Sequence, residues 1–138
     1  MKTFTKNPSK WNKDEILNEL EVFKNLYKDR PVKENIHGMR FQHMLATYFI
    51  LKKLNPSYVI ESGIFKGQST WLIENTLPDS EILSIDINLN QREYISKKVK
   101  YSNIDFKYQD FSNIPKDTLV FFDDHVNHYE RLQQAKFF

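Results

Sequence analysis

Two of the chain's three glycines lie four residues apart, in the stretch VIESGIFKGQST at 59–70. Gly63 and Gly67 follow a short apolar run, and a helical pattern begins at about residue 67. Glycine at such a turn permits positive φ and lets a ligand approach the backbone closely. The helix that follows presents free N–H groups and the positive end of its dipole to an anionic group. The spacing therefore predicts a ligand-binding turn.

Acidic residues lie at the ends of all the predicted strands. The strands expected at 57–62, 81–87, 104–109 and 118–123 lead, in that order, to Glu61, to Asp86, to Asp110 and to Asp123, Asp124 and His125. Ligands of parallel sheets bind beyond the carboxyl ends of the strands, so we expect these side chains to gather at one edge. The alternative is that the aspartates only serve turns and helix N-caps, where Asp is common.

Asp86 and Glu61 indicate the kind of ligand. Asp86 lies 23 residues beyond Gly63, close to the spacing of an acid that holds ribose hydroxyls, which predicts an adenosine-type cofactor. A dinucleotide loop would read G-x-G-x-x-G, whereas Ile64 and Phe65 stand here and leave little room for a pyrophosphate. Glu61 would repel a phosphate and favours a cofactor with an ammonium group and a positive sulfonium. An NAD-type oxidoreductase is therefore the less favoured alternative.

The elements that must position these residues alternate along the chain. Apolar residues at helical spacing predict helices at 13–28 and 41–54, and further helices are expected at 67–77, 91–100 and 126–134. With the four strands, this order predicts an α/β fold. We expect a Rossmann-like open parallel sheet with helices on both faces, preceded by two N-terminal helices. One domain of 1–138 is expected, with a helical segment at 1–56 and a cofactor-binding core at 57–138.

The composition of the chain limits the classes of partner to expect. The chain has 138 residues, 40% of them hydrophobic and 28% charged, and its net charge is only +2. This balance argues against nucleic acid or a membrane surface as the main partner. There is no cysteine, and the N-terminus MKTFTKNPSKW lacks the apolar core of a signal peptide, so a cytoplasmic protein is expected.

The acid-and-glycine pattern resembles the class I S-adenosylmethionine-dependent methyltransferases. Their loop E/D-x-G-x-G-x-G is matched by Glu61, Gly63 and Gly67, the acid after the second strand by Asp86, and the acid after the third by Asp110. More narrowly, VIESGIFKGQSTWLIE followed by FFDDH is similar to a branch that includes cephalosporin hydroxylase-type and rhamnosyl O-methyltransferase-type proteins. The resemblance covers roughly residues 36–138, and the middle glycine of the loop is missing.

The resemblance implies a cofactor role for each matched residue. The backbone at Gly63 and Gly67, with Ser69, would contact the methionine part of S-adenosylmethionine, and Glu61 would face its amino group. Asp86 would bind the ribose hydroxyls, Asp110 would accept from the adenine amino group, and Phe111 would pack near the ring. The segment around His37 would border this pocket.

The triplet after the fourth strand is the expected catalytic position. Asp124 or His125 would take a proton from a hydroxyl of a small-molecule or sugar acceptor. These residues could instead start a site for a divalent metal such as Mg²⁺. A third interpretation makes Asp124 a helix cap and His125 a surface residue. No zinc site is expected, because His125 and His128 lack a third ligand.

The number of strands raises a further expectation. The methyltransferase fold has seven strands and this chain supplies four, so a fold truncated after the fourth strand is expected. An oligomer or a partner chain would then cover the apolar edge strand TLVFF. The alternative to a methyltransferase is a non-catalytic binding or assembly module that keeps the fold without the chemistry.

Overall fold

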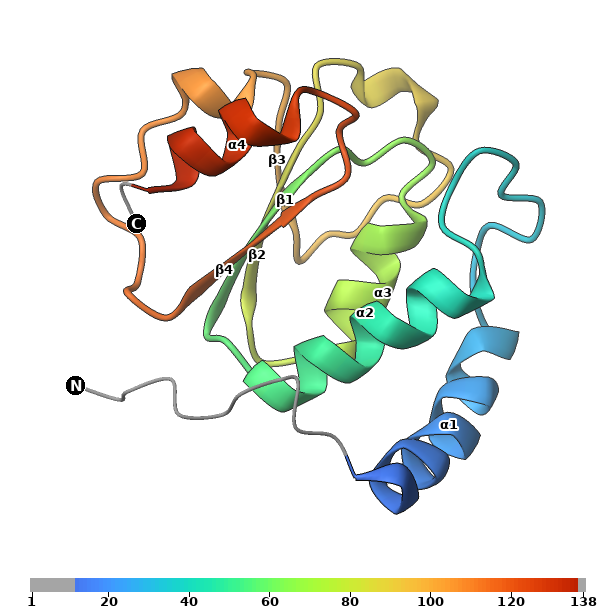
Figure 1. Ribbon diagram of the computed structural model, residues 1–138. Coiled ribbons are helices and arrows are strands. Elements are labelled where there is room, and N and C mark those ends of the chain that lie inside the picture. The colour runs from blue at the N-terminus through green and yellow to red at the C-terminus, as the bar shows by residue number, and fades with distance from the viewer. Residues whose placement is uncertain (1–11, 137–138) are drawn as a thin grey trace.

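The computed structural model describes residues 12–136 (Figure 1). Its helices are α1 (Lys13–Lys28), α2 (Phe41–Leu54), α3 (Gln68–Thr76) and α4 (His128–Ala135). Its strands are β1 (Tyr58–Ser62), β2 (Glu81–Ile85), β3 (Lys100–Ser102) and β4 (Thr118–Phe122), and two 3₁₀ turns are η1 (Leu89–Gln91) and η2 (Phe106–Tyr108).

The strands form one parallel sheet in the order β3-β2-β1-β4. Strand β1 pairs with β2 and with β4, so that Glu61 lies opposite Ser84 on one side and Phe121 on the other. Helices α2 and α3 cover one face, α1 packs on the outside of α2, and α4 lies on the opposite face (Figure 1). The predicted Rossmann-like α/β fold with two leading helices is confirmed.

Alternate side chains of β1 supply two separate cores. Val59 faces α2 and α3, where it packs with Leu51 and Ile73. The next residue, Ile60, points to the opposite face and packs with Phe106, whose ring lies against α4. Successive side chains of a strand point to opposite faces, so a central strand buried on both sides reads as a continuous apolar run.

Helices α1 and α2 have the bounds that their apolar spacing predicts. The Asn12 side chain accepts a hydrogen bond of 2.9 Å from the backbone N–H two residues on, which caps α1. Phe23 is fully buried and packs with Met44 and Tyr48 of α2. Helix α2 ends at Leu54, and the left-handed φ of 43° at its C-cap Asn55 closes the last turn. Burial of these aromatic residues holds the helix pair beside the sheet.

The helix predicted at 91–100 is wrong. The segment after η1 runs irregularly, and the Tyr94 hydroxyl donates to Glu74 Oε2 of α3 at 2.6 Å. The backbone N–H groups of Glu93 and Tyr94 both donate to the Lys66 carbonyl, at 2.9 and 3.0 Å. These long-range bonds use N–H groups that a helix would need, so tertiary contacts override the weak helical pattern.

The strand predicted at 104–109 is also wrong, because the third strand lies a few residues earlier at Lys100–Ser102. In its place the Asp105 carboxylate accepts from the backbone N–H of Lys107 at 3.0 Å and begins η2. Phe106 is 1% exposed and anchors this turn in the core, whereas Ile104 is 52% exposed. One buried aromatic residue in an alternating pattern is compatible with a turn as well as with a strand.

Helix α4 begins at His128 instead of at 126. Its N-cap is Asn127, whose side chain accepts from the backbone N–H of Tyr129 at 3.0 Å. Asp124 therefore does not cap this helix, and its carboxylate makes other contacts.

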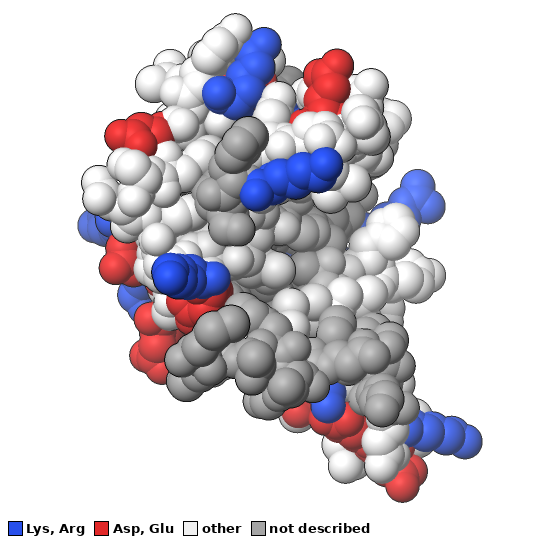
Figure 2. Space-filling model, turned by 60° about the vertical axis from the view of Figure 1, so that its left-hand side comes forward, with Lys and Arg blue, Asp and Glu red and all other residues white. Residues whose placement is uncertain are grey.

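The surface carries both signs of charge. Figure 2 shows one face on which basic and acidic side chains are interspersed and do not form a single field. Among the described residues, no helix has the length and apolar character needed to cross a membrane.

Candidate functional site

A cleft of about 320 Å³ lies beyond the carboxyl ends of β1, β2 and β4. Its lining includes Gly63, Asp86, Asp123 and His125, together with His37 from the loop between α1 and α2. This is the edge of a parallel sheet where ligands bind, and the volume is in the usual range of small-molecule sites. The structure thus brings together residues from four distant parts of the chain.

The glycine loop, residues 63–67, leaves β1 at the cleft. Gly63 has a φ of 100°, and a Cβ atom there would lie 2.5 Å from the backbone carbonyl of Asp123. Gly67 has a φ of 90°, and its Cβ would lie 2.6 Å from the Tyr94 carbonyl oxygen. Gly63 therefore lets the ends of β1 and β4 meet at the cleft, whereas Gly67 packs on the segment after β2 and does not line the cleft.

Asp86 organises the glycine loop. Its Oδ2 accepts from the backbone N–H groups of Ile64 and Phe65 at 2.9 and 3.1 Å, and its Oδ1 accepts from Asn88 at 2.9 Å. A carboxylate has about four acceptor positions, so one position of Oδ1 is left for a hydroxyl group in the cleft. Asp86 thus lies beside the glycine loop at the cleft, and its role toward ribose stays a prediction.

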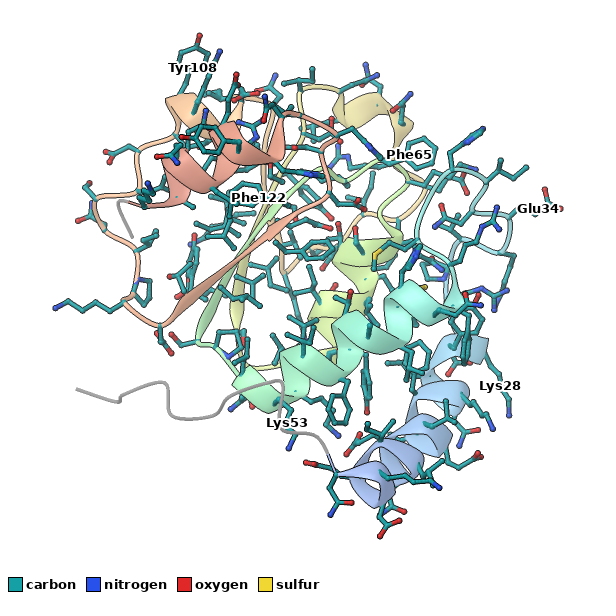
Figure 3. The ribbon with its side chains drawn as sticks, viewed as in Figure 1. Lys28, Glu34, Lys53, Phe65, Tyr108 and Phe122 are labelled. Atoms are coloured by element: carbon teal, nitrogen blue, oxygen red, sulfur yellow. The ribbon has the colours of Figure 1, made fainter. Side chains whose placement is uncertain are left out.

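Backbone strain gathers around the cleft. His37, Phe65 and His125 have positive φ angles of 68°, 50° and 55°, and all three line the cleft. The other described non-glycine residue of this kind, Asn55, ends α2 far from it. Strained backbone persists where the surrounding structure enforces it, and it clusters at functional sites. Figure 3 shows Phe65 on the loop that follows β1.

Glu61 lies behind the glycine loop. It is fully buried and accepts hydrogen bonds from the hydroxyls of Ser69, Thr70 (2.6 Å) and Ser84 (2.5 Å). Burial raises the pKa of the Glu61 carboxyl, and the three hydroxyls oppose that rise. Neither Glu61 nor Ser69 lines the cleft, so their predicted contact with the methionine part stays a prediction.

Asp110 and Phe111 are not brought to the cleft. Asp110 is exposed, and the hydrogen bond from the backbone N–H of Ser112, at 2.9 Å, lowers the pKa of its carboxyl. Phe111 packs on Phe106 with ring centroids 4.8 Å apart. The acid that follows β3 and lines the cleft is Asp105, which the misplaced third strand concealed.

The two aspartates after β4 have different surroundings. Asp124 Oδ2 accepts from Ser62 Oγ at 2.6 Å and from Arg131 Nε at 2.8 Å, and its Oδ1 accepts from the Val126 N–H at 3.2 Å. Asp123 is half-buried and lines the cleft, and burial raises the pKa of its carboxyl. Among the described residues no hydrogen bond to the Asp123 carboxylate is found. Asp123 is therefore better placed than Asp124 to accept a proton.

His125 is exposed at the rim of the cleft. Its positive charge, when protonated, would oppose the rise in the Asp123 pKa, as would those of His43 and His128. Among residues 12–136, no group of three or more metal-binding side chains is placed to hold a metal ion.

Arg131 is a site residue that sequence reasoning missed. It lies on α4 with a side chain only 3% exposed, and it pairs with Asp105 at 2.9 Å and with Asp124 at 2.8 Å. The Arg131 guanidinium lowers the pKa of Asp105 to about 2. A single arginine in a polar helix carries no sequence signal of burial, so only the assembled sheet edge reveals it.

The cleft is acidic overall. It is lined by four aspartates, at 86, 105, 123 and 124, and by one arginine, Arg131, which leaves a formal charge of −3 with neutral histidines. A cleft of one sign focuses the field and attracts the opposite charge. The geometry therefore favours a positively charged ligand over a pyrophosphate.

The comparisons with known proteins bear on the fold. No protein-family model and no curated protein sequence matches the chain. Among solved structures, a CmcI structure with SAH matches with a TM-score of 0.62 and 14% identity, over 71% of this chain and 54% of that one. A CmcI structure with Mg-SAM has a TM-score of 0.55 and 18% identity, over 70% and 46%. An apo-structure of CmcI has a TM-score of 0.58 and 15% identity, over 70% and 46%.

These matches confirm the expected resemblance as a likeness of fold. The neighbours are CmcI structures with SAH, with Mg-SAM and in the apo form. The chain has a Rossmann-like fold, which these structures share. It spans about half the length of these neighbours.

Proposed function

We propose that this chain binds S-adenosylmethionine in the cleft and takes part in methyl transfer to an oxygen of a small molecule or sugar. The acidic cleft beside Gly63, at the carboxyl edge of a sheet with this fold, is the observation that carries the proposal. The likeness to CmcI structures with SAH and Mg-SAM supports it. A formal charge of −3 suits a sulfonium cofactor and disfavours NAD.

The residues of the cleft fit such a cofactor. Gly63 lines the cleft and, without a Cβ, lets its backbone lie against that of Asp123, and Asp86 Oδ1 has an acceptor position left for a ribose hydroxyl. Asp123 supplies a carboxylate for the positive charge of the methionine part or for the acceptor. When bound, the cofactor supplies an activated methyl group, and the protein's task is to align an acceptor hydroxyl with it.

We assign the proton-accepting role to Asp123 in place of Asp124. Asp124 holds Ser62 and Arg131 and is committed to the structure of the sheet edge. Asp123 faces the cleft with a raised pKa, and a base works best when its pKa approaches the working pH. His125 lies beside it at the rim and would pass the proton to solvent.

Direct titration tests the proposed ligand. Calorimetry of the purified chain with S-adenosylmethionine, S-adenosylhomocysteine and NAD should show binding of the first two and none of NAD. Asp86→Ala should weaken binding by roughly 1–3 kcal/mol, because the loop and the ligand lose their acceptor. The matched control is Asp79→Ala, which changes an exposed aspartate in the turn after α3. A folded chain that binds neither adenosyl compound would refute the proposal.

Methyl transfer assisted by a magnesium ion is a variant of this proposal, because Mg²⁺ prefers carboxylate oxygens such as those of Asp123. If the metal takes part, Mg²⁺ should strengthen S-adenosylmethionine binding to the native chain but not to Asp123→Asn. Equal binding in Mg²⁺ and in EDTA would leave Asp123 as a simple base.

A non-catalytic binding or assembly module is the competing function. Strand β4 is an outer strand of the sheet, and all five of its residues are only half-buried. A second copy or a partner chain would cover such an edge. The solution mass of the chain, measured by light scattering beside the titrations, separates the two: an assembly module forms a complex and binds no adenosyl ligand.

A further inference from the structure

A buried ion network underlies the cleft, and the proposed function does not use its central residue. Arg131 Nη1 and Nη2 donate to the two oxygens of Asp105 at 2.9 and 3.0 Å, a bidentate pair. Its Nε donates to Asp124 at 2.8 Å, and Nη1 also donates to Gln134 at 2.9 Å. The guanidinium lies 5.7 Å from the ring centroid of Phe106. Four of the five N–H directions of the arginine are therefore satisfied.

The network joins separate segments around the cleft. Ser62 Oγ, at the end of β1, donates to the same oxygen of Asp124 that Arg131 contacts, at 2.6 Å. Asp105 caps η2, Asp124 follows β4, and Arg131 belongs to α4. All four residues line the cleft. A rigid, bidentate arginine pair of this kind holds geometry as well as charge.

The network divides the cleft carboxylates by their partners. Asp105 and Asp124 are tied to Arg131, whereas Asp86 is held by backbone N–H groups. Asp123 has no hydrogen bond to its carboxylate from a described residue. Arg131 is thus the one permanent positive charge among the residues that line the cleft, and it limits the negative potential there.

We propose that Arg131 determines the charge preference of the cleft, acting as a positioning residue that holds Asp105 and Asp124 and offsets part of their charge. The inference rests on the proposed function, since it concerns two forms of that cofactor. S-adenosylmethionine carries one net positive charge at neutral pH, and S-adenosylhomocysteine carries none. The balance of Arg131 against the aspartates then sets how strongly the cleft prefers the methyl donor over its product.

Charge-changing variants test this inference through the ratio of the two affinities, measured by calorimetry at pH 8 and low salt. Asp105→Asn removes one negative charge and keeps the Arg131–Asp124 pair, so the ratio of S-adenosylmethionine to S-adenosylhomocysteine affinity should fall about threefold to tenfold. Arg131→Gln should raise the ratio by a similar factor. Arg131→Lys keeps the charge and should leave the ratio near that of the native chain.

The matched control is Glu130→Gln on the exposed side of α4, which should not change the ratio. Salt should diminish the differences between variants, because it screens charges. If Arg131→Gln does not fold, as judged by circular dichroism, Asp105→Asn decides the question alone, since it removes no cation.

A merely structural role predicts that both ligands weaken equally and that the ratio stays constant in Asp105→Asn and in Arg131→Gln. That result would overturn the inference while leaving the proposed function intact. A native chain that binds neither ligand would overturn the proposed function, and the inference with it.

Discussion

Two carboxylate sites lie on opposite faces of the sheet, and their partners differ. On the α3 side, Glu61 is fully buried among three hydroxyl groups, and burial raises the pKa of its carboxyl. On the α4 side, Asp105 pairs with Arg131, which lowers the pKa of that carboxyl to about 2. Both carboxylates are well hydrogen-bonded, yet only the Arg131 guanidinium lowers a carboxyl pKa by more than burial raises it.

The difference has opposite consequences for stability. Because the Glu61 pKa is raised on folding, its contribution favours the folded state below its unfolded pKa and is lost as pH rises through the folded value. Because the Asp105 pKa is depressed, its contribution is present above the unfolded pKa and is lost as pH falls. Glu61 on one face of the sheet therefore contributes more to folding stability in acid, whereas Asp105 on the other face contributes more at neutral pH.

Removing the cation should have the largest effect. Arg131→Met keeps most of the side chain's volume but leaves Asp105 and Asp124 without their partner, at an expected cost of roughly 3–5 kcal/mol in the free energy of unfolding. Urea denaturation measures this cost. The control Lys136→Met, at the exposed end of α4, should change stability by less than about 0.5 kcal/mol. A loss below about 1 kcal/mol for Arg131→Met would contradict the idea that the pair sustains the α4 face.

On the other face, truncating the Glu61 side chain and neutralising it should have different costs in the free energy of unfolding. Glu61→Ala leaves a cavity and three hydroxyls without their shared acceptor, at a cost of roughly 2–4 kcal/mol. Glu61→Gln keeps the volume, and the hydroxyls can rotate to pair with an amide, so its cost should be smaller and should shrink further as pH rises. Urea midpoints between pH 5 and 8 test both variants. Equal losses in the two variants would show that the charge of Glu61, and not its shape, is what the hydroxyls require.

The smallest expected effect comes from neutralising Asp105. The pKa of Asp105 falls from 3.8 to about 2 on folding, which at full strength would correspond to roughly 2–3 kcal/mol, and solvent screening of the 25% exposed side chain reduces the expected contribution at pH 7 to about 1–2 kcal/mol. Asp105→Asn should lose that amount at pH 7, and the gap from the native chain should close as pH falls from about 4 to about 2. Chemical denaturation across that range measures the gap. A gap independent of pH would mean that the ion pair with Arg131 does not stabilise the fold.

Much of the fold was predictable because its signals are local. The bounds of α1 and α2 follow from apolar spacing and from caps such as Asn12 and Asn55. The strands β1, β2 and β4 follow from short apolar runs rich in strand-forming residues. The segment between β2 and β4 was predicted wrongly because its contacts are not local. Tyr94 donates to Glu74, and the backbone at 93–94 donates to Lys66, so packing on α3 decided its path.

The residues of the candidate site also divide into those that local sequence signals predict and those that they do not. The position of Gly63 at a strand-to-helix turn and of Asp86 beside it could be predicted, since both depend on the order of neighbouring elements. Asp105 could not, because its place at the cleft depends on where β3 ends. Figure 3 shows Tyr108 of η2 pointing outward, and Phe122 packs with Phe106 on the α4 side of the sheet.

By itself the sequence determined an α/β chain with two leading helices, a glycine loop after its first strand and acids at the sheet edge, because these depend on local pattern. Only the tertiary structure decided which acids are paired. Arg131 lies 26 residues from Asp105, and Ser62 lies 62 residues from Asp124. The surroundings of a carboxylate depend on the groups that meet it in space, so only the folded chain pairs Asp124 with Ser62 and Arg131 and leaves Asp123 lining the cleft beside it.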